Sequence, residues 1–423
     1  MLCQFTVKNF RCFADEITLD MQAAPITEKE ESVAIDTDGK KFLPLAVLYG
    51  PNGAGKSTVI WALSALWIKI IRPVSIAEGK NYSINDTKQG IETFKFSDSH
   101  PHEPTEFEVF FRTSAYEYQY EISVKDEIVK TEQLSRKKIN GKIYSKIFSR
   151  TESSVQLQSS LRNYKIANLS PKIPLLSYLA ITYKQNPIVK DAFAWFENQL
   201  MVFPSVFSAN ESTAAKLMTF FLSSTDDSIR RRVLSMFKEM DIDVKNYRTE
   251  KEANQVKVFT THIISSQPYE LELEHESDGT IKLFWILPFI IGNLMHGSTL
   301  VIDELDSKLH PKLLQYIISL YNDPRKNPKR AQLIFTSHDV STMNEENFRR
   351  DEIWFVAKGD NEASNLYSLV EIKNSDGTSI RKDAKYSKQY LEGRYGADPY
   401  LKKIIQWEDF HANMQQSNEV KES

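Results

Sequence analysis

Hydrophobic and polar residues alternate at the start of the chain, first over residues 5–10 and again over 17–21. Alternation with a period of two predicts a pair of short strands in a small sheet. Residues 42–49 are instead a continuous apolar run that ends at Gly50, as expected of a buried parallel strand, and 58–71 follow with helical periodicity. The pattern therefore predicts a strand, a loop and a helix in succession.

The next part of the chain alternates more regularly. Residues 105–111, 116–122 and 127–130 place apolar side chains at every second position. The dipeptide Asn140-Gly141 is typical of a hairpin turn between two such strands. We therefore expect an antiparallel sheet between residues 92 and 147.

Strand patterns fade from residue 160 to residue 240. Three segments there have the periodicity of amphipathic helices, namely 188–200, 214–222 and 228–240. An α/β rhythm then returns, with alternation over 255–274, a helix over 280–295, short buried strands at 299–302 and 332–336, and further strands between 348 and 369. The polar tail from residue 417 onward is typical of disorder.

The composition is that of a soluble globular protein. The 423 residues are 41% hydrophobic and 26% charged, and the formal net charge of −3 leaves no global field that would draw nucleic acid to the surface. Only two cysteines occur, Cys3 and Cys12, which excludes a disulfide framework. The chain opens on strand-like sequence and not on a basic and apolar leader. We therefore expect a cytoplasmic protein.

The most apolar stretch of the chain covers residues 283–295 and is interrupted by Pro288. It is shorter than the ~20 residues that a bilayer span needs. We expect a buried helix there and no membrane partner.

A glycine-rich octapeptide, Gly-Pro-Asn-Gly-Ala-Gly-Lys-Ser at 50–57, follows the first buried strand. It matches the phosphate-loop pattern GxxxxGK[ST], in which glycines let backbone N–H groups turn toward phosphate oxygens. Lys56 would reach the outer phosphates and Ser57 would hold Mg²⁺ through its hydroxyl, above the positive end of the next helix. We expect the nucleotide to be held by Gly50, Asn52, Gly53, Ala54, Gly55, Lys56, Ser57 and Thr58.

Two carboxylates end another apolar strand, in the sequence Thr-Leu-Val-Ile-Asp-Glu at 299–304. Burying such groups is costly unless a metal or a reacting water needs them. Asp303 would then coordinate Mg²⁺ through a water, and Glu304 would polarise the attacking water as general base. An Asp-Glu pair after a strand also occurs as a plain helix cap. Beside a phosphate loop, the pair predicts ATP hydrolysis.

Two further elements bear on the class of nucleotide-hydrolysing enzyme. Ser277 and Gly279 lie just before an apolar helix, where a hydroxyl and a backbone N–H can bind an anion. His338 lies at the end of the strand that follows the paired carboxylates. Taken singly, each is more often structural, as a helix cap or a core histidine.

The order of these elements is a phosphate loop, a long insertion, a serine–glycine helix start, paired acids and a strand-end histidine. This series resembles the ATP-binding-cassette (ABC) ATPases, and more narrowly the RecF and SMC-type heads. It is most similar to the overcoming-lysogenization-defect (OLD) type and RloA/AbiL-like ATPases of bacterial phage defence. Residues 5–11 are similar to the first strand and arginine of those heads, 305–311 to their D-loop, and 393–397 to a segment of RloA-like chains.

The resemblance implies an α/β fold, an ABC-ATPase head of mixed and parallel sheets with flanking helices and a mainly helical insertion. The head would comprise residues 1–150 and 251–400, the insertion 151–250, and a C-terminal helix or tail 401–423. It also implies ATP and Mg²⁺ as cofactors, and a homodimer or higher oligomer.

The resemblance assigns further roles residue by residue. Ser277 and Gly279 would contact the γ-phosphate held by a second subunit, and Asp306 would cross the dimer interface. His338 would act in catalysis beside Glu304 and Lys56 by sensing the γ-phosphate, and Arg11 would lie near the nucleotide.

The chain departs from the family pattern at three points. Asp278 stands where the family's signature has a glycine, which places a carboxylate near phosphate. We assign no residue to the glutamine of the family's Q-loop. The insertion has no sustained heptads, so the long coiled-coil arms of SMC-type proteins are not expected.

Three functions stay open. The preferred one is an ABC-type ATPase that dimerises on ATP and regulates or scaffolds a separately encoded effector, in anti-phage defence by abortive infection. A DNA repair or maintenance ATPase of RecF type is the second, and it leaves nucleic acid open as a partner. An OLD-like nuclease is the third, although few residues follow His338 for a Toprim domain.

Two short motifs contain residues that could bind a metal, but the nearby sequence lacks the further ligands that a metal site needs. Asp241 and Asp243 form a D-x-D string in a predicted loop, and His100 and His102 lie in a Pro-containing loop. We interpret both as surface features.

Overall fold

A computed structural model describes residues 1–80, 90–204, 227–252, 255–374 and 376–397. The helix predicted over 214–222 and the C-terminal helix or tail predicted over 401–423 lie outside the described residues.

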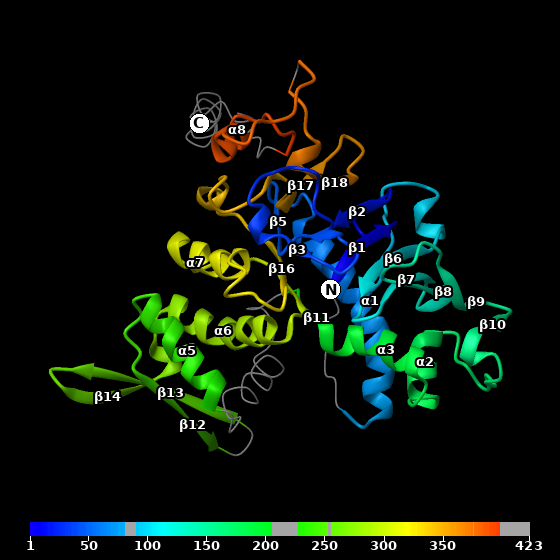
Figure 1. Ribbon diagram of the computed structural model, residues 1–423, viewed down its shortest axis with the longest axis horizontal. Coiled ribbons are helices and arrows are strands. Elements are labelled where there is room, and N and C mark those ends of the chain that lie inside the picture. The colour runs from blue at the N-terminus through cyan, green and yellow to red at the C-terminus, as the bar shows by residue number, and fades with distance from the viewer. Residues whose placement is uncertain (81–89, 205–226, 253–254, 375, 398–423) are drawn as a thin grey trace, which may run out of the picture.

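A six-stranded sheet forms the centre of the molecule, with the strand order β11-β15-β16-β5-β17-β18 (Figure 1). Its first five strands are parallel, and β18 is antiparallel to β17. The strands are β5 (Leu45–Tyr49), β11 (Leu200–Phe203), β15 (Thr299–Ile302), β16 (Gln332–Thr336), β17 (Ile353–Lys358) and β18 (Ser364–Ser368). Every residue of β5, β15 and β16 is buried, as in sheets covered on both faces. Because these strands are parallel, their carboxyl ends meet at one edge.

A seven-stranded antiparallel sheet has the order β10-β9-β8-β7-β6-β1-β2. Its strands are β1 (Leu2–Lys8), β2 (Ile17–Asp20), β6 (Thr105–Arg112), β7 (Tyr116–Lys125), β8 (Ile128–Lys138), β9 (Ser145–Thr151) and β10 (Val155–Leu157). Both predicted groups of strands are confirmed, but they belong to one sheet, since β1 pairs with β2 on one side and β6 on the other. A local pattern of alternating residues cannot predict the pairing of β1 with β6, because the two strands are far apart in the sequence.

The run predicted as one strand over residues 42–49 is divided. Its first residue belongs to β4 (Lys41–Phe42), which pairs with β3 (Ala34–Ile35), and the buried strand β5 begins only at Leu45. Pro44 separates the two, because proline has no N–H to donate to a ladder.

Helices cover both faces of the central sheet (Figure 1). On one side, α1 (Lys56–Ala77), α2 (Leu175–Thr182) and α3 (Pro187–Ala194) share a core with the antiparallel sheet. On the other side lie α5 (Asp227–Glu239), α6 (Asp278–His296), α7 (Pro311–Asn322) and α8 (Tyr386–Leu391). Alternate residues of β5 enter the two cores, Ala46 and Leu48 the first and Leu45, Val47 and Tyr49 the second. The predicted α/β fold class, with parallel and antiparallel sheets and flanking helices, is confirmed.

The segment predicted as a mainly helical insertion, 151–250, also supplies strands. The helix predicted over 188–200 ends as α3 at Ala194, a π-helical turn follows at Trp195–Gln199, and β11 then joins the central sheet beside β15. A third sheet of three antiparallel strands, β12 (Asn246–Glu252), β13 (Gln255–Ile264) and β14 (Gln267–Glu272), lies beside α5 and α6 (Figure 1). The apolar residues of β11 pair with one strand, β15, that follows about a hundred residues later in the chain, and helical periodicity gives no sign of this pairing.

Two helices of the described residues, α1 and α6, are long and apolar enough by length and composition to cross a bilayer. Two thirds of the most apolar window of each is buried inside the protein. Core helices of this length pass the same test, and α6 is the buried helix that the sequence predicts.

Candidate nucleotide site

The phosphate-loop segment, residues 50–57, runs from the end of β5 into the first turn of α1. Two of its glycines have left-handed backbone angles and close neighbours. At Gly50, with φ 153°, a Cβ would lie 2.3 Å from the carbonyl oxygen of Val356. At Gly55, with φ 108°, a Cβ would lie 2.6 Å from Sγ of Cys12. These positions accept only glycine, so the loop can follow a path in which backbone N–H groups face inward.

Lys56 begins α1 and is only 6% exposed. Its Nζ donates hydrogen bonds to the carbonyl oxygens of Gly50 at 2.8 Å and Pro51 at 3.2 Å. Burial lowers the pKa of Lys56, while the carboxylates of Asp303 and Asp306 oppose that shift. A buried ammonium folded over the loop is placed to meet an anion there.

Asp303 lies at the carboxyl end of β15 and is 7% exposed. Its Oδ1 accepts hydrogen bonds from Ser57 Oγ at 3.1 Å and from Thr336 Oγ1 at 2.6 Å. Burial raises the pKa of Asp303, although both hydroxyls and the charge of Lys56 lower it. One carboxylate therefore joins the phosphate-loop helix, β15 and β16 at the edge of the sheet. The oxygens of Ser57 and Asp303 are hard donors of the kind that Mg²⁺ binds, so the pair fits this ion.

Glu304 differs from its neighbour Asp303 in exposure and in backbone conformation. Its side chain is exposed, whereas that of Asp303 is buried. Its backbone has φ 51°, a left-handed angle that is uncommon outside glycine. The angle is held by two hydrogen bonds: the N–H of Glu304 donates to Thr336 Oγ1 at 2.7 Å, and its carbonyl oxygen accepts from Lys282 Nζ at 2.8 Å.

Asp306 and His338 are brought together, but through the histidine backbone. Oδ2 of Asp306 accepts hydrogen bonds from the N–H groups of His338 at 2.9 Å and Asp339 at 3.0 Å. The residue His338 is exposed, and its ring makes no hydrogen bond within the described residues. Oδ1 of Asp306 is buried and likewise without a partner there. The loop after β15 is therefore attached to the end of β16.

Ser277 caps the first turn of α6. Its Oγ accepts a hydrogen bond from the N–H of Thr280 at 3.2 Å, and its side chain is exposed. A Cβ at Gly279 would lie 3.1 Å from the carbonyl oxygen of Lys308. Asp278 forms an ion pair with the same lysine at 3.1 Å. The serine–glycine helix start thus lies beside the loop that follows Glu304. Within the described residues, no hydrogen bond joins Ser277 to the phosphate loop of its own chain.

A protein-family model described as "AAA domain, putative AbiEii toxin, Type IV TA system" matches residues 45–344. The chain belongs to this AAA-domain family. The match spans the phosphate loop, the paired carboxylates and the strand-end histidine, which are the residues that the geometry places at the edge of the central sheet.

Several solved structures are similar to this AAA-domain chain at low identity. An SMC head bound to the C-winged helix domain of ScpA is 12% identical, with 87% of this chain and 97% of that chain covered and a TM-score of 0.45. The SMC head domain from Thermotoga maritima is 13% identical, with 88% and 99% covered and a TM-score of 0.41. The recombination mediator protein RecF with ATPrS is 12% identical, with 86% and 98% covered and a TM-score of 0.30. Likeness at these scores adds nothing to the argument from the chain's own geometry. No curated protein matches the chain.

Arg11 lies in the turn between β1 and β2, beside the start of α1 in this AAA-domain protein. Its guanidinium lies 4.6 Å from the ring of Trp61 and 5.4 Å from that of Phe10, and it pairs with Glu92 at 3.5 Å. Trp61 is in the second turn of α1, so Arg11 lies beside the phosphate-loop helix. Its position near the nucleotide stays a prediction.

Two residues that sequence reasoning missed hold the site together. Thr336 carries the hydroxyl between Asp303 and Glu304, and Lys282 holds the carbonyl of Glu304. A lysine next to the apolar pair Leu283 and Phe284, on the buried face of a helix, was a signal that could have been read. A threonine that ends a strand carries no such signal.

Neither of the two short motifs considered as metal ligands forms a metal site. A ring nitrogen of His100 lies 2.6 Å from a serine hydroxyl, and His102 shares the short helical turn with it. Asp243 pairs with Lys245 at 2.6 Å, and Asp241 is exposed with φ 57°. In the described part of the chain, neither pair gathers a third His, Cys, Asp or Glu.

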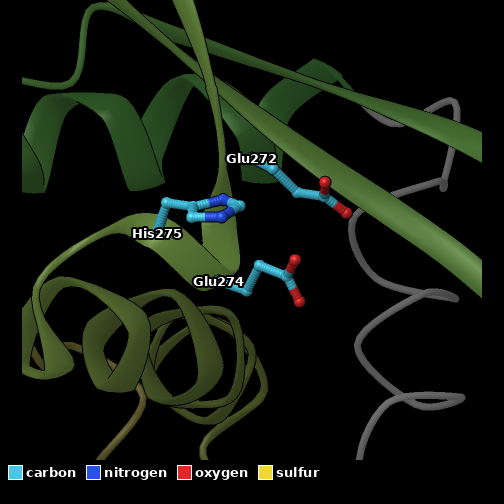
Figure 2. Close-up of side chains that lie close together, drawn as sticks. All are labelled: Glu272, Glu274 and His275. Atoms are coloured by element: carbon cyan, nitrogen blue, oxygen red, sulfur yellow. The ribbon is translucent and has the colours of Figure 1, made fainter.

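Three potential ligands do come together at Glu272, Glu274 and His275, where ligand atoms all lie within 4.8 Å of one another. Figure 2 shows the two carboxylates pointing to the same side, with the imidazole to their left. Glu274 and His275 are exposed and Glu272 is half-buried and pairs with Lys257. Exposed acidic groups of this kind are common without a metal, so we assign no site here.

Proposed function

We propose that this protein is an ABC-type ATPase that binds ATP and hydrolyses it to ADP and phosphate. The observation that carries the proposal is the hydrogen-bonded set of Ser57, Asp303 and Thr336, with Glu304 next to it. A phosphate-loop serine and a strand-end carboxylate share one hydrogen bond, and an exposed carboxylate follows immediately. That arrangement suits phosphoryl transfer, in which positioning and charge stabilisation do most of the work.

In this proposal each site residue of one chain has its own role in ATP hydrolysis. The backbone N–H groups of the loop and the ammonium of Lys56 bind the phosphate oxygens. Ser57 and Asp303 would hold Mg²⁺, which supplies positive charge to the phosphates when bound. Glu304, whose side chain is exposed beside Asp303, accepts the proton of the attacking water as general base. His338 contacts the γ-phosphate, and Arg11 lies near the nucleotide.

Completion of the site requires a second copy of the chain. Ser277 is exposed at a helix start and, within the described residues, does not bond its own phosphate loop. Hydroxyl and N–H groups at a helix start bind anions. Ser277 and Gly279 therefore bind the γ-phosphate of the partner's ATP, with Asp306 at the interface, and ATP closes a homodimer that hydrolysis releases.

The biological setting we propose is anti-phage defence, with a separately encoded effector protein as the partner that the ATPase regulates. Support comes from the family description, which names an AbiEii toxin and a type IV toxin–antitoxin system. The similarity of the motif order to OLD-type and RloA/AbiL-like ATPases points the same way. We place the protein in the cytoplasm, where ATP is available.

Replacement of Glu304 by Gln tests the proposal. The amide cannot accept the proton, so steady-state hydrolysis should fall by a factor on the order of 100 or more while ATP still binds. ATP should then hold the dimer closed, which multi-angle light scattering would detect as a doubled mass at saturating ATP.

Two further variants complete this experiment. Glu345→Gln changes an exposed glutamate outside the site and should behave as the wild type. Ser277→Arg added to Glu304→Gln should abolish the dimer, because it blocks the contact with the partner's phosphate. A Glu304→Gln protein that stays monomeric in ATP would show that the two-chain mechanism is wrong.

A further inference from the structure

A buried lysine, Lys282, lies on α6 about one turn after the exposed Ser277 and is 0% exposed. Its Nζ donates to the carbonyl oxygen of Glu304 at 2.8 Å, to that of Ser307 at 2.6 Å, and to Ser307 Oγ at 2.9 Å. An ammonium group has three donors, and three acceptors on one short loop surround it. The loop is the one that begins with the proposed general base.

Lys282 does more than fill space. The adjacent Leu283 and Phe284 are fully buried and already belong to the core, where an apolar residue would pack without desolvating a charge. Burial lowers the pKa of Lys282 to about 8, while the carboxylates of Asp306 and Glu304 raise it and Lys308 lowers it further. A costly buried charge with three bonds to one loop indicates that the loop needs to be held.

What is held is an unusual backbone. Glu304 and Lys308, at the two ends of the loop, have left-handed φ values of 51° and 59°. Such angles persist when surrounding contacts determine them. The bonds from Lys282 fix the loop between those two residues, and with it the direction of the Glu304 side chain.

The same lysine belongs to a rigid helix. Ser277 and Lys282 are five residues apart on α6, roughly 7.5 Å along its axis at about 1.5 Å per residue. The first turn of α6 meets the loop a second time, through Gly279 and Asp278 against Lys308. The helix α6 is therefore joined to the loop at two places, at its first turn and at Lys282.

We propose that Lys282 is a positioning residue that couples the two ATP sites of a dimer. Seating of Ser277 on the partner's γ-phosphate moves α6, and Lys282 transmits that movement to Glu304 of its own chain. Each general base is thereby aligned only when the neighbouring site is filled. This inference rests on the proposed function, in which Ser277 and Glu304 of one chain serve different ATP molecules.

Mixed dimers with a single working site test the coupling. Two differently tagged chains are purified together, and one chain carries Glu304→Gln, so that only the other chain's Glu304 hydrolyses ATP. Lys282→Met, which keeps the length of the side chain but not its charge, is then placed in either chain. The rate and KM of the working site are measured in both arrangements.

The expected result is asymmetric. In the same chain as the working Glu304, Lys282→Met should lower kcat at least tenfold and leave KM within about twofold, because ATP binding does not use Lys282. When Lys282→Met is instead in the chain that supplies Ser277 to the working site, kcat should stay within about twofold of the kcat of the mixed dimer that lacks Lys282→Met. Equal losses in both arrangements, or no loss in either, would overturn the proposal.

Controls separate folding and the parent proposal from this inference. Ser307→Ala removes one acceptor and keeps the lysine charge, so it should lower kcat a few-fold in the same arrangement even if Lys282→Met fails to fold. Wild-type kcat in the Ser307→Ala dimer would count against coupling. Lys312→Met removes an exposed lysine from the neighbouring helix and should change nothing. If the wild-type protein hydrolyses no ATP, the proposed function fails; if it does and the Lys282 variants match it, only the coupling fails.

Discussion

Thr336 offers the sharpest test of how the site is held. It is fully buried at the end of β16, and its hydroxyl donates to Asp303 and accepts from the backbone of Glu304. The change Thr336→Val replaces the hydroxyl by a methyl group of similar size. Packing is kept, and only the two hydrogen bonds are lost.

The expected loss in the free energy of unfolding follows from those two hydrogen bonds. A hydrogen bond to a charged group contributes about 1.5–3 kcal/mol, and a buried N–H left without a partner costs about 1–3 kcal/mol. The N–H of Glu304 is only partly buried, so water recovers some of the second amount. We expect Thr336→Val to lower the free energy of unfolding by about 3 kcal/mol. At roughly 2 °C per kcal/mol for a large chain, the Tm should fall by roughly 6 °C.

Thr336→Ser is the matched control, because it keeps the hydroxyl and removes only a methyl group. It should cost about 1 kcal/mol, or roughly 2 °C in Tm. The kcat values of Thr336→Val and Thr336→Ser should also differ. If about 1.4 kcal/mol of the lost alignment is expressed in the transition state, kcat of Thr336→Val falls about tenfold, whereas Thr336→Ser stays near wild type. Differential scanning fluorimetry and a phosphate-release assay give both numbers, and equal values for the two variants would refute the reasoning.

Two more predictions follow from individual contacts. Gly50→Ala should abolish ATP binding in a fluorescent-nucleotide titration, because the new Cβ would lie 2.3 Å from the carbonyl oxygen of Val356. Gly53→Ala should weaken ATP binding less, because a Cβ at Gly53 meets nothing within 4 Å. Similar affinities for ATP in the two variants would contradict this reasoning. Burial raises the pKa of Glu352 from 4.5 to about 8, so the folded protein binds more protons than the unfolded chain between those values and loses stability as the pH rises through them. Glu352→Gln should therefore raise the Tm at pH 8.5 and change it little at pH 4.5, and a pH-independent shift would argue against it.

The sequence predicts those parts of the site whose residues are adjacent in the chain. The phosphate loop is a strand, a turn and a helix start within one stretch of chain, so its conformation follows from glycine positions and periodicity. The same holds for Asp303 and Glu304 at the end of β15. Their proximity to the loop follows from a rule about parallel strands, whose carboxyl ends share an edge.

What the sequence does not reveal depends on side chains that meet across long separations. Thr336 reaches Asp303 over 33 residues, and Lys282 reaches Ser307 over 25. Nothing local distinguishes Thr336 from an ordinary strand threonine. Lys282 has a local signal in its place beside Leu283 and Phe284, but that signal does not say which loop the lysine contacts. The contact of Cys12 with the loop at Gly55 is of the same kind, since it requires the antiparallel sheet to pack against α1.

The departure at Asp278 shows why a motif needs its surroundings. In the sequence, a carboxylate in place of glycine suggests repulsion of the phosphate that Ser277 is proposed to bind. In the structure, the carboxylate pairs with Lys308, so its charge is offset by a cation from the chain's own loop. Both groups are well exposed, and such a pair contributes at most about 1 kcal/mol. It can therefore open at little cost in the proposed dimer, while the buried bonds of Lys282 stay in place and keep α6 attached to the loop of Glu304.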